Sequence, residues 1–478
     1  MTMLSTFTKT TTSRRALAIR TLPMLALALP LAVLPVSAFA QTATGAVFSK
    51  PDSDFKGRVS PGGVVVPGAE ITLRGSSFTP GQTVILLSGS TVLNPDGKPY
   101  VADDKGGFEA KIAIPADTTP GQHPIIVNVA NPAAAIVVPL KVSPVIAISG
   151  ADKFNINSQQ VVRGLYQVAY SPKNNVLFVT SAVGRPPVKE SKLVKLNPET
   201  LAVVATADAK PVAGRDDGHL HAIYGVAVDD AEGNVWTTTT RDNAVAVFKQ
   251  DDLSLVKQFE ADILPHGRDV VVDAEAGRAY ASSVDENFVV VFDAKALTKL
   301  QNIEIPSKRR GEKFTPASLA LDAKNHKLYT VSLKTSEAAI IDTKTNTVEK
   351  TFPLPGAKSA IGVAVDSANN QLYVASQGSD NLLIVDIASG KVLHDVATGA
   401  GPLNVAFDPV AKLAYVANRG SGTVTVVNPQ GEIVANLEGG SFPNHIGIDG
   451  KGNVFVINKA RGENDATGDR VTRLTPKS

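Results

Sequence analysis

Cysteine is absent from this chain of 478 residues. Its absence excludes disulfides, thiolate metal sites and cysteine nucleophiles. The sequence also lacks a phosphate-binding Walker loop and the G-x-G-x-x-G, H-E-x-x-H and G-x-S-x-G motifs. Several large enzyme classes are therefore unsupported by any local motif. After residue 40 no apolar run reaches the length of a membrane span.

Residues 1–40 are predicted to be an export signal rather than part of the fold. Four basic residues and no acidic ones precede or flank an apolar stretch, Leu22 to Val36, and Ala38-Phe39-Ala40 follows it. This pattern predicts cleavage before Gln41. Residues 12–17 also resemble part of a twin-arginine signal, which exports folded proteins. We therefore expect a periplasmic or secreted protein without a transmembrane segment after cleavage. An uncleaved anchor is the alternative, although three prolines interrupt the apolar run.

Removal of this segment changes the charge balance. The whole chain has 47 basic and 45 acidic residues, and residues 41–478 have 43 and 45, a net charge of −2. A slightly acidic protein has no overall field that attracts a polyanion. Only 5% of the residues are aromatic, so stacking platforms for single-stranded nucleic acid are also few.

Seven repeats follow Gly164. Each has an apolar strand ending in Asp or Ser, a tight polar turn and a second apolar strand. The strand ends are Ser171, Asp229, Asp273, Asp322, Asp366, Asp408 and Asp449, with spacings of 58, 44, 49, 44, 42 and 41 residues. A period of about 40–45 residues with four short strands predicts a β-propeller, because single units bury both faces only by stacking in a ring.

The predicted organisation has three parts after the signal. Residues 41–58 form a polar, flexible lead-in, and residues 59–143 alternate short strands with Pro/Gly turns. That alternation predicts a small antiparallel β-sandwich. Residues 144–478 form the propeller. The fold class is therefore all-β.

The last repeat has only three strands before the chain ends. We expect residues 144–163 to supply the fourth, from Pro144–Ser149 or Gln159–Arg163. A ring closed by both ends of the domain leaves no exposed sheet edge at the seam.

Two second strands carry a family resemblance. Leu372-Tyr373-Val374-Ala375-Ser376 and Ala414-Tyr415-Val416-Ala417-Asn418 resemble the YVTN repeat of YncE-like and surface-layer β-propellers. The resemblance covers about residues 160–478 and implies a seven-bladed, usually exported ring without a shared catalytic set. Residues 67–84 and 115–121 resemble bacterial immunoglobulin-like domains of exported proteins, which bears on fold more than function.

Strand order predicts which face of the ring binds a ligand. In each antiparallel unit the turns between strands one and two and between strands three and four lie on one face. The loops between strands two and three and the crossings into the next unit lie on the other. The second set is long and irregular: Val183–Ser191, Lys210–Tyr224, Pro306–Phe314 and Lys459–Arg470. Insertions on one face of a repeat array usually mark the binding face, although neutral drift also lengthens surface loops.

Nine polar residues near the start of the first strands are predicted to lie where this face meets the central channel. They are Arg163, His219, His221, Tyr224, His266, Arg268, Lys358, Asn444 and His445. His219 and His221 should point the same way in an extended chain. A metal site completed by His266 or His445 is the alternative; it is not predicted, because no carboxylate stands at ligand spacing. Lys308, Arg309 and Arg310 form a basic loop on the same face, a candidate for phosphate contacts or a solvated charge run.

The leading functional hypothesis is an exported, non-catalytic binding protein without a cofactor, metal or catalytic residues. Its ligand is unknown, and single-stranded nucleic acid or a cell-envelope component are candidate partners. Two alternatives stay open. One is a propeller enzyme of the lactone-hydrolase or quinone-dependent dehydrogenase type, which would use the channel-mouth histidines and arginines. The other is a structural protein of the cell envelope.

Overall fold

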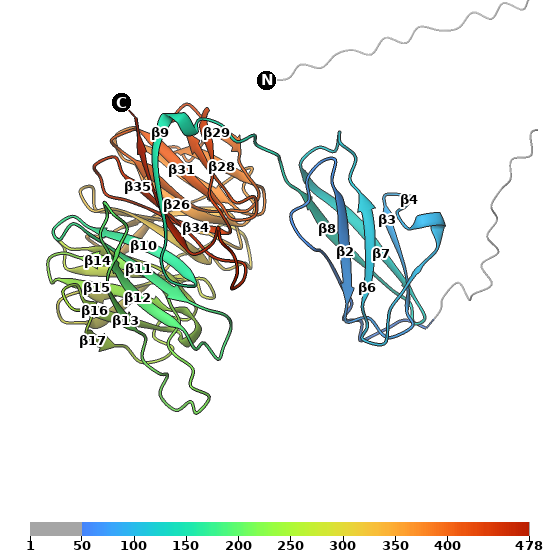
Figure 1. The fold of residues 1–478 in the computed structure, drawn as a ribbon, viewed down its shortest axis with the longest axis horizontal. Coiled ribbons are helices and arrows are strands. Elements are labelled where there is room, and N and C mark those ends of the chain that lie inside the picture. The colour runs from blue at the N-terminus through green and yellow to red at the C-terminus, as the bar shows by residue number, and fades with distance from the viewer. Residues whose placement is uncertain (1–49, 478) are drawn as a thin grey trace, which may run out of the picture. The chain divides into compact units, whose positions relative to one another are not determined.

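The computed structural model describes residues 50–477, so the predicted export signal lies outside the described residues. These residues fold almost entirely as β-strands (Figure 1). Three short 3-10 helices interrupt them: η1 (Pro95–Gly97), η2 (Ala151–Lys153) and η3 (Thr240–Asp242). Within residues 50–477 no helix is both long and apolar enough to cross a membrane.

The N-terminal part consists of two antiparallel sheets. One has the strand order β1-β2-β6, and the other has the order β4-β3-β7-β8 with β5 paired to β3. The bounds are β1 (Arg58–Pro61), β2 (Glu70–Ser76), β3 (Thr83–Ser88), β4 (Thr91–Val92), β5 (Tyr100–Val101), β6 (Phe108–Ala113), β7 (Gly121–Ala130) and β8 (Ala134–Val142). The alternating pattern of residues 59–143 therefore does form short antiparallel strands.

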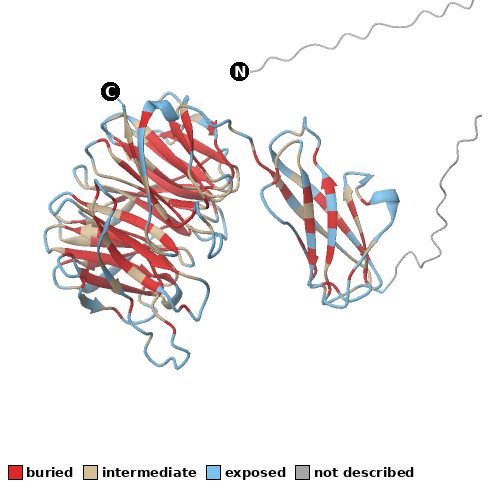
Figure 2. Cartoon of the chain, in the orientation of Figure 1, coloured by how far each residue is buried: buried red, intermediate tan, exposed pale blue. Residues whose placement is uncertain are grey.

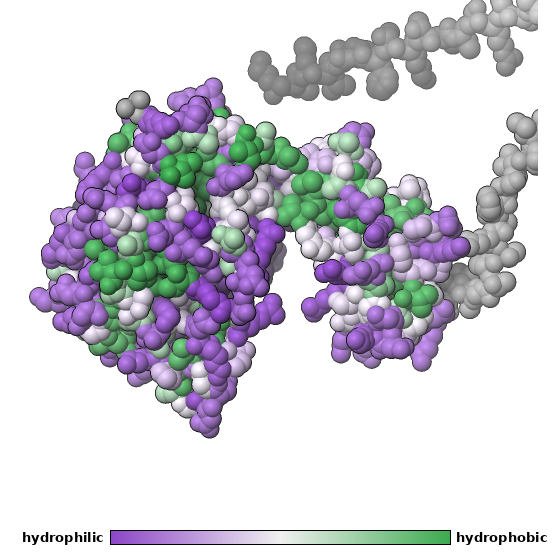
Figure 3. All heavy atoms as spheres, viewed as in Figure 1, coloured by the Kyte–Doolittle hydropathy of each residue, from purple (hydrophilic) through white to green (hydrophobic). Residues whose placement is uncertain are grey.

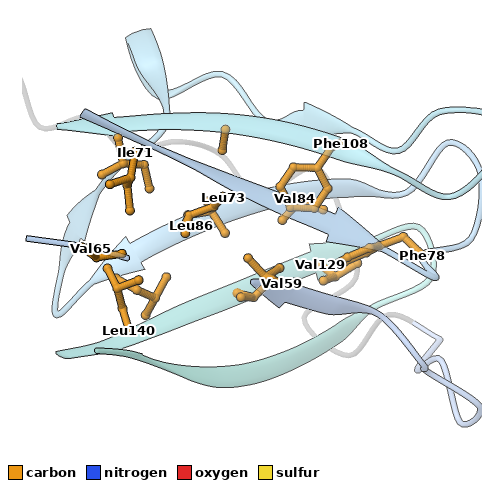
Figure 4. Packing of buried hydrophobic residues seen from close by; sticks show 14 of the residues in the cluster. Val59, Val65, Ile71, Leu73, Phe78, Val84, Leu86, Phe108, Val129 and Leu140 are labelled. Atoms are coloured by element: carbon orange, nitrogen blue, oxygen red, sulfur yellow. The ribbon is translucent and has the colours of Figure 1, made fainter. Parts of the chain in front are cut away.

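The alternation of apolar and polar residues along the strands explains the core of the N-terminal part. Along β6 every second residue is buried, so Phe108, Ala110 and Ile112 point inward and their neighbours face solvent. They meet Val84 and Leu86 from the other sheet in one apolar cluster (Figure 4). All members of this cluster come from residues 55–142.

Part of the predicted lead-in packs on these sheets. The backbone N–H of Asp52 donates to the Ala133 carbonyl at 2.8 Å. The Asp52 carboxylate accepts a hydrogen bond from the Gln82 side chain at 3.0 Å, and Phe55 packs against the core. Residues 50–57 are therefore held by the first domain, which the polar composition of this segment did not indicate.

Seven four-stranded antiparallel sheets follow in chain order. The first strands are β10 (Leu165–Ser171), β14 (Ile223–Asp229), β18 (Gly267–Asp273), β22 (Pro316–Asp322), β26 (Ala360–Asp366), β30 (Pro402–Asp408) and β34 (Pro443–Ile448). The second strands are β11 (Val176–Ala182), β15 (Asn234–Thr239), β19 (Arg278–Ser283), β23 (Lys327–Ser332), β27 (Gln371–Ser376), β31 (Leu413–Asn418) and β35 (Val454–Asn458).

The outer two strands of each sheet complete the repeat. The third strands are β12 (Ser191–Leu196), β16 (Ala244–Lys249), β20 (Phe288–Asp293), β24 (Glu337–Asp342), β28 (Asn381–Asp386), β32 (Thr423–Val427) and β36 (Arg470–Pro476). The fourth strands are β13 (Val203–Asp208), β17 (Leu255–Gln258), β21 (Thr298–Glu304), β25 (Thr347–Pro353), β29 (Val392–Ala397), β33 (Ile433–Glu438) and, in the last sheet, β9 (Phe154–Gln160).

The sheets close into a ring. Each first strand contacts the first strand of the next sheet, and β34 contacts β10. The closing strand β9 pairs with β36 from Gln160–Arg470 to Phe154–Pro476. It lies within residues 144–163, as predicted, and of the two suggested segments it overlaps only the second, Gln159–Arg163, at Gln159 and Gln160. Of those segments, Pro144–Ser149 instead lies against the sixth sheet, where Ser149 forms a bridge with Asn436 of β33.

Burial decreases from the second strand outward. The second strands are buried on both faces because a neighbouring sheet packs on each side, whereas β13 and β21 are mostly exposed (Figure 2). Trp236 of β15 is fully buried and packs against Phe259 and Phe292 across the boundary between two sheets. Hydrophilic residues cover much of the visible surface of the ring (Figure 3).

The repeated Asp has a structural role in the turn after each first strand. Asp229 Oδ1 accepts hydrogen bonds from the N–H groups of Ala231 and Glu232, both at 3.1 Å. Asp366 and Asp408 make equivalent bonds to the residues that follow them. Such side-chain-to-backbone bonds hold a tight turn, so the most regular feature of the sequence is accounted for by backbone geometry.

Candidate functional site

A cavity of about 250 Å³ lies at the centre of the ring. Its walls come from six of the seven sheets. The lining residues are Tyr166, Gln167, Tyr224, Thr240, Arg241, His266, Arg268, Val284, Leu333, Leu403, Asn444 and His445. Of the nine residues predicted for the channel mouth, the structure therefore brings together Tyr224, His266, Arg268, Asn444 and His445.

Irregularities in the first strands aim several of these side chains into the cavity. Every first strand shifts register near its start, between Leu165 and Val168 in β10 and between Gly267 and Val270 in β18. The residues in these shifts are left outside the regular ladder, and such bulges re-aim side chains. Tyr166, Gln167, Tyr224, Arg268, Leu403 and Asn444 all lie within them.

A second set of residues follows the second strands and was missed by sequence reasoning. Antiparallel pairing places this position opposite the start of the first strand: the Val284 N–H donates to the His266 carbonyl and the Arg419 N–H donates to the Gly401 carbonyl. Lys459 occupies the same place in the last sheet. The repeat pattern could have identified these residues, because it shows where each second strand ends and which residue follows it.

Four cations gather in and around the cavity. Arg241 and Arg268 line it, and Arg419 and Lys459 lie close enough to act on their charges. Burial lowers the pKa of Arg268, and Arg419 lowers it further, while the neighbouring Asp269 opposes the shift. Burial also lowers the pKa of Lys459 to about 8, with Arg419 adding to the effect. The lining residues include no carboxylate.

Two tyrosines form one wall. The ring centroids of Tyr166 and Tyr224 are 3.9 Å apart at an interplanar angle of 50°. Arg241 Nε donates to Tyr224 Oη at 3.4 Å, and Lys459 Nζ lies 3.9 Å from the centroid of the Tyr166 ring. Burial raises the pKa of Tyr166, so its hydroxyl stays protonated at neutral pH. An aromatic face beside cations suits an anionic group attached to an apolar body.

The two histidines of the cavity have different surroundings. His445 Nδ1 accepts a hydrogen bond from the Val168 N–H at 3.4 Å, and burial, with a contribution from Arg268, lowers its pKa to about 3. His445 is therefore neutral and links the last sheet to the first. His266 is more open: its side chain is 41% exposed, and its Nδ1 lies 3.4 Å from Asp285 Oδ2.

Polar side chains at the position of His445 tie neighbouring sheets together elsewhere in the ring. Gln167 Oε1 accepts from the Val226 N–H at 3.0 Å, and Asn404 Oδ1 accepts from the Ile446 N–H at 2.9 Å. Asp269 Oδ2 likewise accepts from the Leu319 N–H at 2.9 Å. These contacts join first strands whose backbones are otherwise paired only within their own sheets.

His219 and His221 do not line the cavity. Both point toward Asp242, as their alternation predicted: His219 Nε2 is 3.0 Å from Oδ1, and His221 Nδ1 is 3.4 Å from Oδ2. His219 is buried, and its Nδ1 accepts from the Val188 N–H at 2.7 Å. Both nitrogens of His219 are thus engaged in holding the 183–191 and 210–224 loops to η3. Among residues 50–477 no group of three or more His, Asp or Glu side chains is arranged to hold a metal ion.

The remaining predicted site residues lie outside the cavity walls. Arg163 is ion-paired with Glu190 and Glu463, both at 3.1 Å, and Lys358 is exposed. Lys308, Arg309 and Arg310 are exposed on a loop held by Glu337, whose carboxylate accepts from the Lys308 N–H at 2.7 Å. The loop is anchored by its backbone, so the three cationic side chains are available to solvent.

A closed ring of radially repeated four-stranded sheets around a central cavity defines a β-propeller protein. Among known proteins, the chain is similar to YncE. It is 26% identical to the uncharacterized protein YncE of Salmonella typhimurium over 325 residues, which cover 64% of this chain and 86% of that protein. It is 24% identical to YncE of Escherichia coli K12 over 263 residues, which cover 52% and 69%. No protein-family model matches the chain.

Solved structures show the same fold at lower identity. A catalytically inactive virginiamycin B lyase from Staphylococcus aureus, solved with quinupristin, aligns with a TM-score of 0.53 at 12% identity, covering 68% of this chain and all of that one. The hydrazine synthase of Kuenenia stuttgartiensis aligns with a TM-score of 0.53 at 14% identity, covering 66% and 96%. At these identities the likeness concerns the fold alone.

Proposed function

We propose that this chain is an exported, non-catalytic binding protein that holds its ligand in the central cavity of a seven-bladed, YncE-like β-propeller. The observation that carries the proposal is convergence: six sheets each contribute side chains to one volume of about 250 Å³. Ligand sites are typically concave and mostly apolar, with a few placed polar groups. In this proposal the N-terminal two-sheet domain is an immunoglobulin-like spacer or docking module.

The chemistry of the lining favours binding over turnover. The lining holds no Ser, Lys, Asp or Glu side chain, and the Thr240 hydroxyl donates to the Gly267 carbonyl. His445 is neutral and accepts a backbone hydrogen bond. A nucleophile paired with a base is therefore not part of the wall. The loops around the mouth, including Lys308–Arg310, would contact a larger partner, such as an envelope component or single-stranded nucleic acid.

One observation favours the enzyme alternative. His266 lies in the cavity, partly exposed, with Asp285 3.4 Å from its Nδ1 and Arg268 two residues away. A carboxylate-oriented histidine can act as a general base, and an arginine can stabilise the anion that forms. A lyase or hydrolase of an anionic substrate would use this arrangement.

Native mass spectrometry of protein prepared from periplasmic and medium fractions tests the proposal. We expect small-molecule adducts on the wild type whose mass stays constant during incubation, and loss of these adducts in the His266→Ala/Arg268→Ala double variant. An Asn325→Ala/Asn346→Ala variant, altered in the turns on the opposite face, is the matched control and should retain them. Adducts that persist on the cavity variant would place the site elsewhere, and adducts that change mass over time would favour the enzyme.

Export makes a separate prediction within the same proposal. The signal pattern of residues 1–40 supports cleavage before Gln41. Intact-mass measurement of the expressed protein should find a chain that begins at Gln41 in the periplasmic or medium fraction. A full-length chain retained in membranes would contradict export by cleavage.

A further inference from the structure

Arg268 is a cation without a protein partner. Among the described residues no ion pair of its guanidinium is found, and its Nε is buried without a hydrogen-bond partner. The nearest carboxylate in sequence, Asp269, uses its oxygens for the N–H groups of Leu319 and Val270. Buried donors in folded proteins are nearly always satisfied, so an orphaned one at a cavity wall calls for an acceptor.

The surrounding cations strengthen this requirement. Arg241 donates to Tyr224, Arg419 donates to Asn444 at 2.6 Å, and Lys459 donates to the Ala182 carbonyl at 3.0 Å. These partners are neutral. The carboxylates that act on the cluster, Asp269 on Arg268 and Asp469 on Lys459, accept hydrogen bonds from backbone N–H groups. Like charges held close together in a partly buried site repel one another, and an entering anion relieves that repulsion.

Part of the wall is apolar or aromatic, beside the polar Gln167, Thr240, His266, Asn444 and His445. Val284, Leu333 and Leu403 line the cavity together with the Tyr166–Tyr224 pair. Inorganic anions would leave this surface unused. A volume of about 250 Å³ is at or below the small end of drug-sized ligand sites, so it suits one compact molecule.

We propose that the cavity binds a small organic anion, with one carboxylate or phosphate-monoester group on Arg268 and a compact apolar body against the tyrosine pair and the aliphatic wall. This proposal rests on the proposed function and adds the chemical class of the ligand. A planar guanidinium matches the two oxygens of either group in a bidentate arrangement. The apolar body supplies the part of the affinity that burial of hydrocarbon provides.

Four probes that share a phenyl ring and differ in charge distinguish the contribution of the anionic group to binding from that of the apolar body. Benzoate and phenyl phosphate carry the two anionic groups, benzyl alcohol is neutral, and benzylamine is a cation. Isothermal titration of the purified full-length chain should show both anions binding at least tenfold more tightly than benzyl alcohol, and no binding of benzylamine. The order of the two anions shows which oxyanion the site prefers.

Substitutions of Arg268 test whether this residue binds the anion. Arg268→Gln should weaken benzoate binding at least tenfold and leave the affinity for benzyl alcohol unchanged. Arg268→Lys should recover only part of the lost affinity, because an ammonium group lacks the planar guanidinium that binds two oxygens at once. Arg163→Gln is the matched control, since this arginine is already paired with two glutamates outside the cavity. If Arg268→Gln does not fold, Arg241→Gln, on an exposed residue, should weaken the anions in the same direction.

The outcomes separate this inference from the proposed function. Equal affinity for benzoate and benzyl alcohol, unaffected by Arg268→Gln, would overturn the anion inference and leave the cavity as a binding site. Binding of benzoate that is lost in Arg163→Gln but not in Arg268→Gln would overturn the location. No binding of any probe would overturn the anion inference, while the adducts sought by mass spectrometry would still decide the proposed function.

Discussion

Arg268 and His445 reach the same cavity from the third and the seventh sheet, and the arginine helps to keep the histidine neutral. Burial is the larger cause of the lowered His445 pKa, and the guanidinium charge adds to it. One residue is thus a cation without a protein partner, and the other is a neutral acceptor that joins the last sheet to the first.

The lowered pKa of His445 predicts a loss of stability in acid. The pKa falls from 6.5 to about 3 on folding, so between these values the unfolded chain binds a proton that the folded chain does not. Stability therefore falls as the pH decreases through this window, with a slope of at most about 1.4 kcal/mol per pH unit from this group.

A His445→Asn variant tests this relationship, because Asn404 fills the matching position in the sixth sheet. Urea unfolding at several pH values between 7 and 4 should show a shallower decline for the variant than for the wild type. Parallel curves would mean that His445 titrates alike in both states.

Lys459 should be an unusually acidic lysine. Burial, assisted by Arg419 and Arg241, lowers its pKa to about 8, so about half of it is neutral at pH 8. After reductive methylation with ¹³C-formaldehyde, one resonance should titrate near that value, and Lys459→Arg should remove it. Lys451, whose pKa is raised by its hydrogen bond to Tyr170, is the internal control. Arg419→Gln should move the Lys459 titration upward; an unchanged midpoint would exclude the charge contribution.

The closing strand β9 should contribute to stability through its first residue. Phe154 is 4% exposed and packs edge-on against Tyr415, with ring centroids 6.3 Å apart. Phe154→Ala should cost about 3 kcal/mol by loss of burial and creation of a cavity. Ile156→Ala on the same strand should cost far less, because Ile156 is 48% exposed. Chemical denaturation measures both, and similar losses would contradict the packing role of Phe154.

The hydrogen bonds that side chains make between neighbouring first strands should also contribute to the stability of the ring. Asn404 is buried, and its Oδ1 accepts from the Ile446 N–H at 2.9 Å. Asn404→Leu leaves that N–H without a partner and should cost about 1–3 kcal/mol. Asn404→Gln keeps an acceptor, as Gln167 does at the matching position, and should lose less of the free energy of unfolding. A leucine variant as stable as the wild type would show that the bridge contributes nothing.

The two-sheet domain and the ring should fold independently. The apolar cluster of the first contains only residues before Ser143, and the clusters of the ring contain only residues from Phe154 onward. A chain of residues 144–478 should therefore be soluble and melt cooperatively. An insoluble product, or one without a cooperative transition, would contradict this boundary. Removal of residues 144–163 from that chain should cause aggregation, because it takes away β9 and exposes the β36 edge.

Much of the fold was predictable because its signals are local. Strand alternation in residues 70–142 and the Asp that ends most first strands are readable over a few residues, and the structure shows the hydrogen bonds that explain them. The site was predicted only in part. Tyr224, Arg268 and Asn444 were found because they begin first strands, whereas Arg419 and Lys459 were missed because they follow second strands.

The period, the strand ends and the turns can be predicted from the sequence alone, since these features depend on neighbours along the chain. Tertiary structure decided which side chains share one cavity. Ring closure by β9 and β36 brings together residues as far apart as Tyr166 and Asn444, whose side-chain amide donates to the Tyr166 carbonyl at 2.7 Å. Bulges then turn some first-strand residues toward the axis and leave others in the ladder. Burial and charges from other sheets also decide the state of each histidine. His445 is buried and neutral and joins two sheets, whereas His266 is partly exposed.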